Sequence, residues 1–352
     1  MKKVLMITCL NTSKEKFDGE RIKCTLICNS LKKFTDLDVI NLSVYKVINT
    51  IKIFFKALFQ KKKYEYVVIS KDAHGANIIQ KILRLGRYPS SRTVYFEIGP
   101  FLYDRILNGS IKKETFINDK LIVLETDSMK EELKEFGFER IGVFPNFKPI
   151  CRIPFNEQKY PKEVLKLVYL SRIEEPKGIY DLINCLSVLN KDKTMFILDV
   201  YGRPQNAEEE KKIKDLSNKY KFVRFLGMLE VGSEESYKQL SQYDLHVFPT
   251  KYREGFPGSI IDFFIAGVPT LSSSFARAHE ILTENDSIVF KQGDNNALQE
   301  KLVFIYNNQN KLNELRKNSF SRREQYSVES FEKYLKQLID NDFGDMTLES
   351  NN

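Results

Sequence analysis

The fold of the C-terminal half is decided by the stretch Phe248-Pro249-Thr250-Lys251-Tyr252-Arg253-Glu254-Gly255-Phe256-Pro257-Gly258-Ser259-Ile260-Ile261-Asp262. An apolar strand pattern runs through a glycine turn into a helical pattern. Pro257 suits the first turn of a helix, and the backbone amides of Gly255 and Phe256 are placed where an anion binds at a helix start. The stretch therefore predicts a strand, a turn and a helix with an anion site between them.

Two acids belong to this stretch. Glu254 lies in the turn and Asp262 about two turns into the expected helix. We expect both to face the crevice at the carboxyl ends of the strands, where parallel sheets bind ligands. The alternative is purely structural: Glu254 is then an acid at a helix start and Asp262 a solvated surface acid.

Short apolar runs rich in β-branched residues recur on both sides of this stretch, between longer helical patterns. In the C-terminal half these expected strands are 167–171, 196–201, 223–226, 245–249, 270–272 and 288–290. In the N-terminal half they are 4–9, 38–42, 66–70, 93–97 and 121–125. Alternation of strands and helices implies βαβ units and a parallel sheet. The chain is therefore predicted to be an α/β protein with two such sheets in tandem.

A chain of 352 residues is expected to form two domains. Proline density rises and the helical and strand periodicity lapses between about residues 145 and 162. The predicted parts are an N-terminal Rossmann-like domain over 1–148, a linker over 149–163, a C-terminal Rossmann-like domain over 164–325, a helix over 326–342 that we expect to cross back to the N-terminal domain, and a frayed tail over 343–352.

The formal net charge of +8 is unevenly divided. Residues 1–150 contain 27 Lys and Arg against 17 Asp and Glu, and the remainder 28 against 30. The basic half is therefore expected to meet an anionic surface or substrate. Five cysteines without paired spacing argue against a disulfide framework or a zinc site. The cysteines are expected to be reduced and buried in a cytosolic protein. Because the first apolar run ends without a cleavage site and no run reaches about 18 apolar residues, no segment is expected to cross a bilayer.

The segment 44–63 reads as a basic amphipathic helix. Its apolar face would carry Val47, Ile48, Ile51, Phe54, Phe55 and Leu58, and its polar face Lys46, Asn49, Lys52, Lys56, Gln60 and Lys63. We favour an ordinary crossover helix packed on the sheet, since a βαβ unit needs one here. The alternative is attachment to an anionic membrane surface through the lysines.

The ends of three more strands are polar or glycine-rich. Arg172 and Lys177 lie on one loop before an apolar helix, an arrangement that suits a diphosphate. The alternative for these cations is surface pairing with Glu174 and Glu175. At the ends of the next two strands stand Gly202-Arg203 and Gly227, where glycine permits a turn or a close ligand approach.

The order of these parts resembles the C-terminal domain of family 4 glycosyltransferases, the retaining group with the GT-B fold, over about residues 120 to 306. The matching features are Arg172, Lys177-Gly178, Gly202, Phe225-Leu226-Gly227, the apolar strand 244–249, Glu254-Gly255-Phe256-Pro257, Ala266-Gly267-Val268-Pro269 and Glu280-Ile281. The resemblance implies two Rossmann-like domains whose parallel sheets face across an interdomain cleft. The N-terminal domain would bind the acceptor, and the C-terminal domain the nucleotide sugar.

The resemblance also implies roles for the site residues. Arg172 and Lys177 would stabilise the leaving diphosphate, Glu254 would orient the transferred sugar, and Asp262 would hold the ribose. The remaining donor-binding residues would be Gly202, Arg203, Gly227, Gly255, Phe256 and Pro257. The family has Glu at the position of Asp262, one methylene longer, and Asp can still accept these hydrogen bonds after a small shift of the helix or the sugar.

The N-terminal half resembles the family more loosely. Gly19 and Lys23, in the segment that begins at Asp18, resemble the family's glycine loop and first helix near the donor phosphates. His74 follows a strand where the family keeps a histidine near the transferred sugar, although a solvated loop histidine is an equal alternative. Glu97 is a candidate contact for the acceptor, or else it merely forms a turn.

The function implied is metal-independent, retaining transfer of a sugar from a nucleotide diphosphate sugar, with UDP favoured, to a glycan or lipid-diphosphate-linked acceptor in surface-polysaccharide synthesis. No cofactor and no metal are expected. The place of action would be the cytoplasm or the inner face of the cell membrane. A nucleic-acid partner is disfavoured because the aromatic residues follow sheet periodicity. The rival functions are a non-catalytic sugar-nucleotide-binding protein and another GT-B enzyme, such as an epimerase or an inverting transferase.

Overall fold

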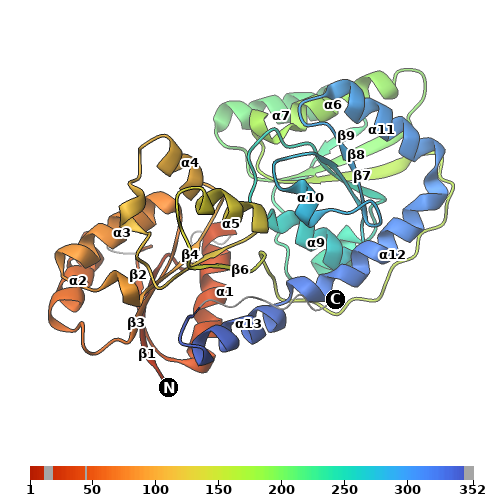
Figure 1. Cartoon of the computed structure of the whole chain (residues 1–352). Coiled ribbons are helices and arrows are strands. Elements are labelled where there is room, and N and C mark those ends of the chain that lie inside the picture. Colours follow the sequence, from red (N-terminus) through yellow and green to blue (C-terminus); the bar gives the residue numbers. More distant parts are fainter. Residues whose placement is uncertain (12–18, 44–45, 345–352) are drawn as a thin grey trace. The chain divides into compact units, whose positions relative to one another are not determined.

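The computed structural model describes residues 1–11, 19–43 and 46–344. Asp18, Val44 and the part of the expected tail over 345–352 lie outside the described residues. The chain forms two compact units, which are described separately (Figure 1). Unit 1 contains Met1–Lys148 and the chain from Ser327 onward, and unit 2 contains Pro149–Tyr326.

Unit 1 is built on a six-stranded parallel sheet with the strand order β2-β1-β3-β4-β5-β6. Its strands are β1 (Lys3–Thr8), β2 (Asp36–Asn41), β3 (Tyr66–Lys71), β4 (Thr93–Glu97), β5 (Leu121–Leu124) and β6 (Ile141–Val143). Its helices are α1 (Gly19–Phe34), α2 (Lys46–Phe59), α3 (Ala73–Leu85), α4 (Leu102–Leu107), α5 (Asp127–Lys134) and α13 (Val328–Asp340). The five strands expected here are present, and the short β6 and α4 were not predicted.

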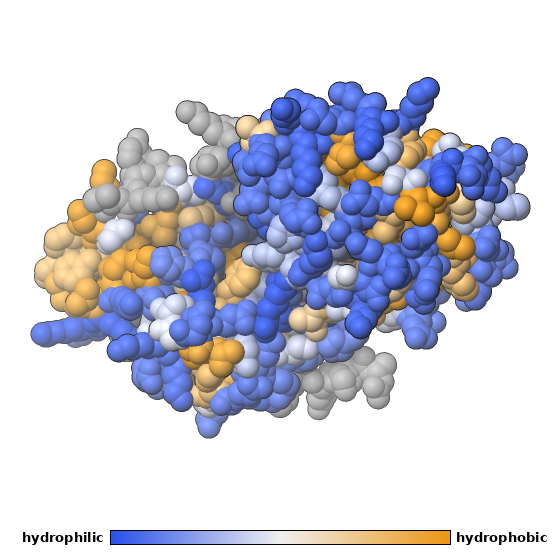
Figure 2. All heavy atoms as spheres, turned by 90° about the horizontal axis from the view of Figure 1, so that it is seen from above, coloured by the Kyte–Doolittle hydropathy of each residue, from blue (hydrophilic) through white to orange (hydrophobic). Residues whose placement is uncertain are grey.

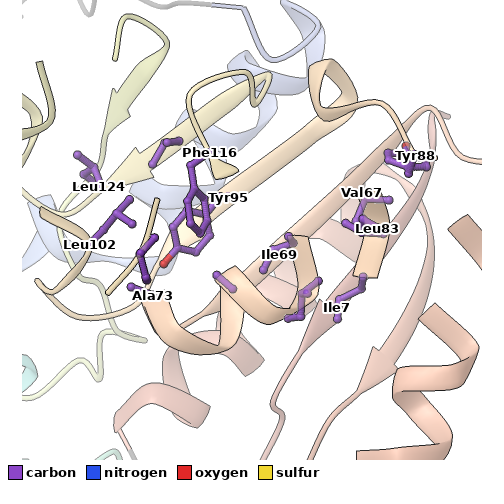
Figure 3. Close-up of a cluster of buried hydrophobic side chains, with 14 of the residues drawn as sticks. Ile7, Val67, Ile69, Ala73, Leu83, Tyr88, Tyr95, Leu102, Phe116 and Leu124 are labelled. Carbon is purple, nitrogen blue, oxygen red and sulfur yellow. The ribbon is translucent and has the colours of Figure 1, made fainter. Parts of the chain in front are cut away.

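Both faces of this sheet are covered by apolar cores, as the near-continuous apolar strand sequences require. On one face, α2, α3 and α5 pack over a core in which Tyr95 and Phe116 lie 5.2 Å apart between ring centres (Figure 3). On the other face lie α1 and α13. Phe331 of α13 stacks on Phe147 with ring centres 3.9 Å apart. Helix α13, which follows unit 2 in the sequence, thus completes the core of unit 1.

Unit 2 is built on a second six-stranded parallel sheet, with the strand order β12-β11-β10-β7-β8-β9. Its strands are β7 (Leu165–Leu170), β8 (Phe196–Tyr201), β9 (Val223–Phe225), β10 (Leu245–Phe248), β11 (Thr270–Ser273) and β12 (Ser287–Phe290). Its helices are α6 (Ile179–Leu189), α7 (Ala207–Lys219), α8 (Glu234–Leu240), α9 (Gly258–Ala266), α10 (Ala278–Ile281), α11 (Asn295–Asn307) and α12 (Leu312–Arg322). The expected α/β class with two parallel sheets is confirmed.

The segment 149–163 lies along unit 2 without a helix or strand of its own. The Lys162 ammonium pairs with the buried Asp244 carboxylate at 2.5 Å, and Asn313 donates a hydrogen bond to the backbone oxygen of Gln158 at 2.7 Å. At the other end of the chain, Phe343 is fully buried and packs against Tyr66. The prediction that the frayed tail begins at residue 343 is therefore wrong, because Phe343 belongs to the core of unit 1.

Helix α2 is the crossover between β2 and β3, but the expected faces are partly wrong. The side that packs on the sheet carries Ile53 and Ala57, and also Asn49, whose amide donates to the backbone oxygen of Asn41 at 2.6 Å. Ile51 and Phe55, expected to be buried, are half exposed. Within the described residues, none of the helices has the length and apolar run that crossing a bilayer requires.

The stack of Phe331 on Phe147 predicts that α13 stabilises unit 1 selectively. Phe331→Ala should destabilise unit 1 by about 3–5 kcal/mol, because it removes a fully buried aromatic ring. Hydrogen exchange should show faster exchange in β4 and β5, with unit 2 as the internal reference. Phe304→Ala, at a ring that is 43% exposed, is the matched control and should change little. Unchanged protection of β4 and β5 would contradict the prediction.

Candidate functional site

The strand order of unit 2 reverses between β7 and β10. From β7 the chain adds β8 and β9 on one side, then returns to add β10 on the other side of β7. In open parallel sheets ligands bind at such a reversal, beyond the carboxyl ends of the two strands. The loops that follow β7 and β10 are those that carry Lys177 and Glu254.

These two loops are in direct contact because residue 178 is glycine. Gly178 has φ +74°, and a Cβ atom there would lie 2.0 Å from the carbonyl oxygen of Pro249. The amide of Lys251 donates to the carbonyl oxygen of Pro176 at 2.8 Å. The Lys251 ammonium also pairs with Glu175 at 2.9 Å and with Asp181 at 2.8 Å. Only glycine permits this approach of one backbone to the other.

The approach brings Lys177 and Glu254 together. The Lys177 Nζ atom lies 2.5 Å from Glu254 Oε1, and the two side chains are only 7% and 11% exposed. The Lys177 ammonium also lies 5.0 Å from the centre of the Tyr252 ring. Because few water molecules reach the pair, its charges act on each other and on a ligand more strongly than surface charges do. The alternative of a surface pair between Lys177 and Glu174 or Glu175 is therefore wrong.

The Glu254 carboxylate is held by a second donor, Thr250. The fully buried Thr250 hydroxyl donates to Glu254 Oε1 at 2.7 Å and accepts from the Tyr252 amide at 3.1 Å. The Thr250 carbonyl oxygen accepts from the Ser273 hydroxyl at 2.6 Å. Both bonds to the carboxylate end on Oε1, and among the described residues none ends on Oε2. The free lone pairs of Oε2 can therefore accept a hydrogen bond from a ligand.

A buried arginine also holds the backbone of the turn that carries Glu254. Arg277 is fully buried and donates to the backbone oxygen of Glu254 at 3.2 Å. Thr250 and Arg277 were not identified from the sequence. Thr250 lies in the stretch that indicated the site, directly after a strand, whereas Arg277 has no signal in the sequence that would separate it from a surface arginine.

Asp262 is neither a surface acid nor two turns into its helix. Helix α9 begins at Gly258, so Asp262 lies about one turn in. Its side chain is buried, and Asp262 Oδ1 accepts a hydrogen bond from the Tyr237 hydroxyl of α8 at 3.0 Å. Burial and the Asp262 charge raise the pKa of Tyr237, so this hydroxyl stays protonated and remains the donor.

The start of α9 also differs slightly from the expectation. Pro257 is the N-cap residue and not the first helical residue, and the helix begins without a side-chain cap. Phe256 is buried against Tyr326, with ring centres 5.1 Å apart. Gly255 precedes it in the same turn. The backbone of 255–258 therefore has the position at a helix start that the sequence predicted.

The ends of β8 and β9 join the loop that carries Arg172. A Cβ atom at Gly202 would lie 1.8 Å from the carbonyl oxygen of Ser171, and the Gly202 amide donates to the Gly227 carbonyl at 2.8 Å. The backbone oxygen of the exposed Arg203 accepts a hydrogen bond from the Ile173 amide at 3.0 Å. The Arg172 side chain is 55% exposed and pairs with Glu174 at 3.1 Å. The pairing with Glu174 considered for Arg172 is thus present, although the Glu174 side chain is only 7% exposed.

The candidate residues of unit 1 lie at the end of β4 or in the first two turns of α1 and α3. Glu97 ends β4, is buried, and accepts from the Leu102 amide at the start of α4 at 2.7 Å. Lys23 of α1 forms a buried ion pair with Glu125. Gly19 is the first residue of α1, and the exposed His74 lies in the first turn of α3. Their roles toward donor and acceptor stay predictions.

Beside His74, Lys71 is a cation that was not identified from the sequence. It ends β3 and pairs with Glu20 and with Asp72, the latter at 2.9 Å. Burial opposes its charge, but the hydrogen bonds to these two acids outweigh burial and raise the pKa of Lys71. Lys71 is therefore a fixed positive charge at this edge of the sheet.

Residues 153–322 match the family model described as Glycosyl transferases group 1. Glycogen synthase of Mycobacterium tuberculosis is 25% identical over 181 residues, which are 48% of this chain and 42% of the relative. The chain thus aligns with less than half of this curated relative.

Solved structures with the GT-B fold match almost the whole chain. HepE of Anabaena, in complex with UDP and glucose, matches with a TM-score of 0.68 at 13% identity, over 97% of this chain and 100% of that one. Sucrose-phosphate synthase of Thermosynechococcus elongatus matches with a TM-score of 0.73 at 15% identity, over 97% of this chain and 99% of that one. The lipopolysaccharide outer core galactosyltransferase WaaB matches with a TM-score of 0.68 at 15% identity, over 97% of this chain and 99% of that one. The GT-B fold expected from the sequence is confirmed.

The contact between Gly178 and Pro249 predicts an unusually large cost for a single methyl group. Gly178→Ala should destabilise unit 2 by more than Gly227→Ala, which should cost about 1–2 kcal/mol because of its left-handed backbone alone. Both glycines have φ near +75°, but a Cβ atom at Gly227 meets nothing within 4 Å. Urea unfolding of the two variants measures the difference. Equal destabilisation would contradict the close approach of the loops.

Proposed function

We propose that this protein is a retaining glycosyltransferase that moves a sugar from a nucleotide diphosphate sugar to a hydroxyl of an acceptor. The observation that carries the proposal is the buried contact of Lys177 with Glu254 at the strand-order reversal of unit 2. This contact lies within the segment that matches the glycosyltransferase family. It combines a cation for a leaving diphosphate with a carboxylate for sugar hydroxyls.

The chemistry follows from the charge that develops during transfer. As the bond between the sugar and the diphosphate breaks, negative charge grows on the leaving phosphate oxygens, and preorganised donors stabilise it more in the transition state than in the ground state. The Lys177 ammonium has three protons, so it can keep Glu254 and still donate to a phosphate. Arg172 and the amides at the start of α9 would supply further donors.

The two acids would hold the sugar and the ribose. Glu254 Oε1 is occupied by Lys177 and Thr250, so Oε2 is the oxygen proposed to accept from a hydroxyl of the transferred sugar. Asp262, whose Oδ1 accepts from the Tyr237 hydroxyl, would accept from the ribose hydroxyls. Because Asp is shorter than Glu, the ribose would sit closer to α9.

UDP is the proposed nucleotide, and the UDP and UDP-glucose named for the Anabaena HepE structures support this choice. We also propose that transfer needs neither a metal nor another cofactor, since Lys177 and Arg172 would provide the positive charge. Retention would follow from attack by the acceptor hydroxyl on the side of the leaving group. Rates that do not change with EDTA would support the cationic role of the two side chains.

The proposed acceptor is a glycan or a lipid-diphosphate-linked saccharide in surface-polysaccharide synthesis, met at the inner face of the cell membrane. The likeness of the fold to the lipopolysaccharide galactosyltransferase WaaB supports this class of acceptor. Glu97 and His74, at the strand ends of unit 1, are the proposed acceptor and sugar contacts.

Binding of UDP is the first test of this function. UDP should raise the melting temperature of the protein more than GDP or ADP, because a ligand that binds only the folded state stabilises it by mass action. Lys177→Ala should weaken UDP binding by roughly tenfold to a hundredfold, as loss of a charge-assisted hydrogen bond does. The exposed Lys191→Ala is the control. Equal UDP affinity in Lys177→Ala would remove Lys177 from the site.

Catalysis is tested separately from binding. Glu254→Gln should lower donor hydrolysis or transfer by at least about tenfold, equivalent to about 1.4 kcal/mol of transition-state stabilisation, because the neutral amide no longer balances the Lys177 charge. Glu208→Gln, an exposed acid on α7, should leave the rate unchanged. NMR of the product should show the anomeric configuration of the donor. An inverted product, an epimerised donor, or UDP binding without any turnover would each identify a rival function.

A further inference from the structure

Helix α2 has a second apolar face, and that face is exposed to solvent. Ile48, Ile51, Phe55 and Phe59 are 52%, 50%, 52% and 71% exposed. Their spacing of three, four and four residues places them on one side of the helix. The opposite side carries Ile53 and Ala57, which are 1% and 2% exposed and pack on the sheet. Packing of unit 1 therefore uses one side of α2 and leaves the other without a partner in unit 1.

The exposed apolar surface continues onto α3. Ile78 and Leu85 are 47% and 72% exposed. The two helices are in close contact, since a Cβ atom at Gly86 would lie 2.5 Å from the Ala57 Cβ atom. We name Ile48, Ile51, Phe55, Phe59, Ile78 and Leu85 the α2–α3 surface. Figure 2 shows apolar side chains gathered over the end of unit 1 that these helices form.

The aromatic rings in this surface are arranged against each other and not against the core. Phe55 and Phe59 stack with ring centres 5.8 Å apart and an angle of 14° between their planes. Single exposed apolar residues are ordinary, but contiguous apolar patches on soluble proteins mark sites of interaction with proteins or membranes. The α2–α3 surface therefore requires a partner that offers apolar contact.

The charge around the surface identifies the kind of partner. Residues 46–63 contain six lysines and no acid, and residues 73–87 contain Lys81, Arg84 and Arg87 and no acid. Lys52, Lys62 and Lys81 are exposed, whereas Lys56 and Lys63 contact Asp38 of the neighbouring strand. A partner that fits is apolar at its centre and negatively charged at its rim.

We propose that the α2–α3 surface docks on an anionic lipid bilayer, with Ile51, Phe55 and Phe59 in the boundary between headgroups and acyl chains. An amphipathic helix with lysines beside large apolar residues lies in the plane of such an interface. The surrounding cations meet anionic headgroups, which attract basic residues near the membrane surface. A bilayer supplies the apolar interior and the negative rim in one partner, whereas a second copy of this chain would bring like charges together.

This attachment is independent of the sugar-transfer reaction, because the α2–α3 surface contains none of the residues assigned to donor or acceptor. The result of a test of docking should therefore not depend on the result of the UDP tests. It would, however, keep the protein where a lipid-linked acceptor is found, which is the acceptor class of the proposed function.

Vesicle flotation of the full chain tests the proposal. The protein should float with vesicles of phosphatidylcholine containing phosphatidylglycerol, and binding should fall as salt rises. Ile51→Ser with Phe55→Ser should weaken binding by about tenfold or more, from the lost burial of two apolar side chains. Lys52→Ala with Lys62→Ala should weaken it by a similar factor on anionic vesicles. Vesicles of phosphatidylcholine alone should bind weakly.

Matched variants on unit 2 are the controls. Phe304→Ser removes an exposed ring and Lys211→Ala with Lys221→Ala removes two exposed charges, and neither should change flotation. The melting temperature without ligand and the circular dichroism spectrum should be the same in all α2 variants as in the wild type, which shows that they are folded. Equal binding to neutral and anionic vesicles would overturn the proposal. So would wild-type flotation by the Ile51 and Phe55 double variant, or a dimer of the wild type that this variant abolishes without any vesicle binding.

Discussion

The candidate site depends on one steric constraint, the contact of Gly178 with the carbonyl oxygen of Pro249. In a parallel sheet the loops after β7 and β10 lie at the same edge. This alone does not bring the Lys177 Nζ atom within 2.5 Å of Glu254 Oε1. That distance needs two backbones closer than a Cβ atom permits. The glycine in the Lys177-Gly178 pair therefore decides the position of the lysine that precedes it.

The structure holds this pair in place before any ligand arrives. Glu254 Oε1 accepts hydrogen bonds from Lys177 and Thr250. The backbone on either side is fixed because Arg277 donates to the Glu254 carbonyl oxygen and Ser273 donates to the Thr250 carbonyl oxygen. A charge that is already oriented in a site with little water stabilises a developing anion without reorganisation. Thr250, Ser273 and Arg277 thus matter for the site because they keep the orientation of one carboxylate.

Sequence patterns predicted what depends on local order and missed what depends on packing between distant segments. Strand β8 was expected at its observed bounds, 196–201, because buried parallel strands are continuous apolar runs. Strand β6 has only three residues, too few for a pattern. The Tyr237 bond to Asp262 joins residues 25 positions apart, and nothing at either position indicates the other. Likewise, the partner of Lys177 is 77 residues away, so the nearer Glu174 and Glu175 were the natural alternatives.

Helix α2 shows why a hydrophobic period alone does not predict which face is buried. A helix that is apolar on most of its circumference has two candidate faces, and the sheet accepts the one that fits its surface. In unit 1 that face carries Ala57, whose small side chain permits the close contact with Gly86 of the segment after α3. The larger rings of Phe55 and Phe59 are left outside, although burying them in the core would have been more favourable in water. Retention of large rings among lysines is understandable if a bilayer, and not the core, is the environment in which those rings are buried.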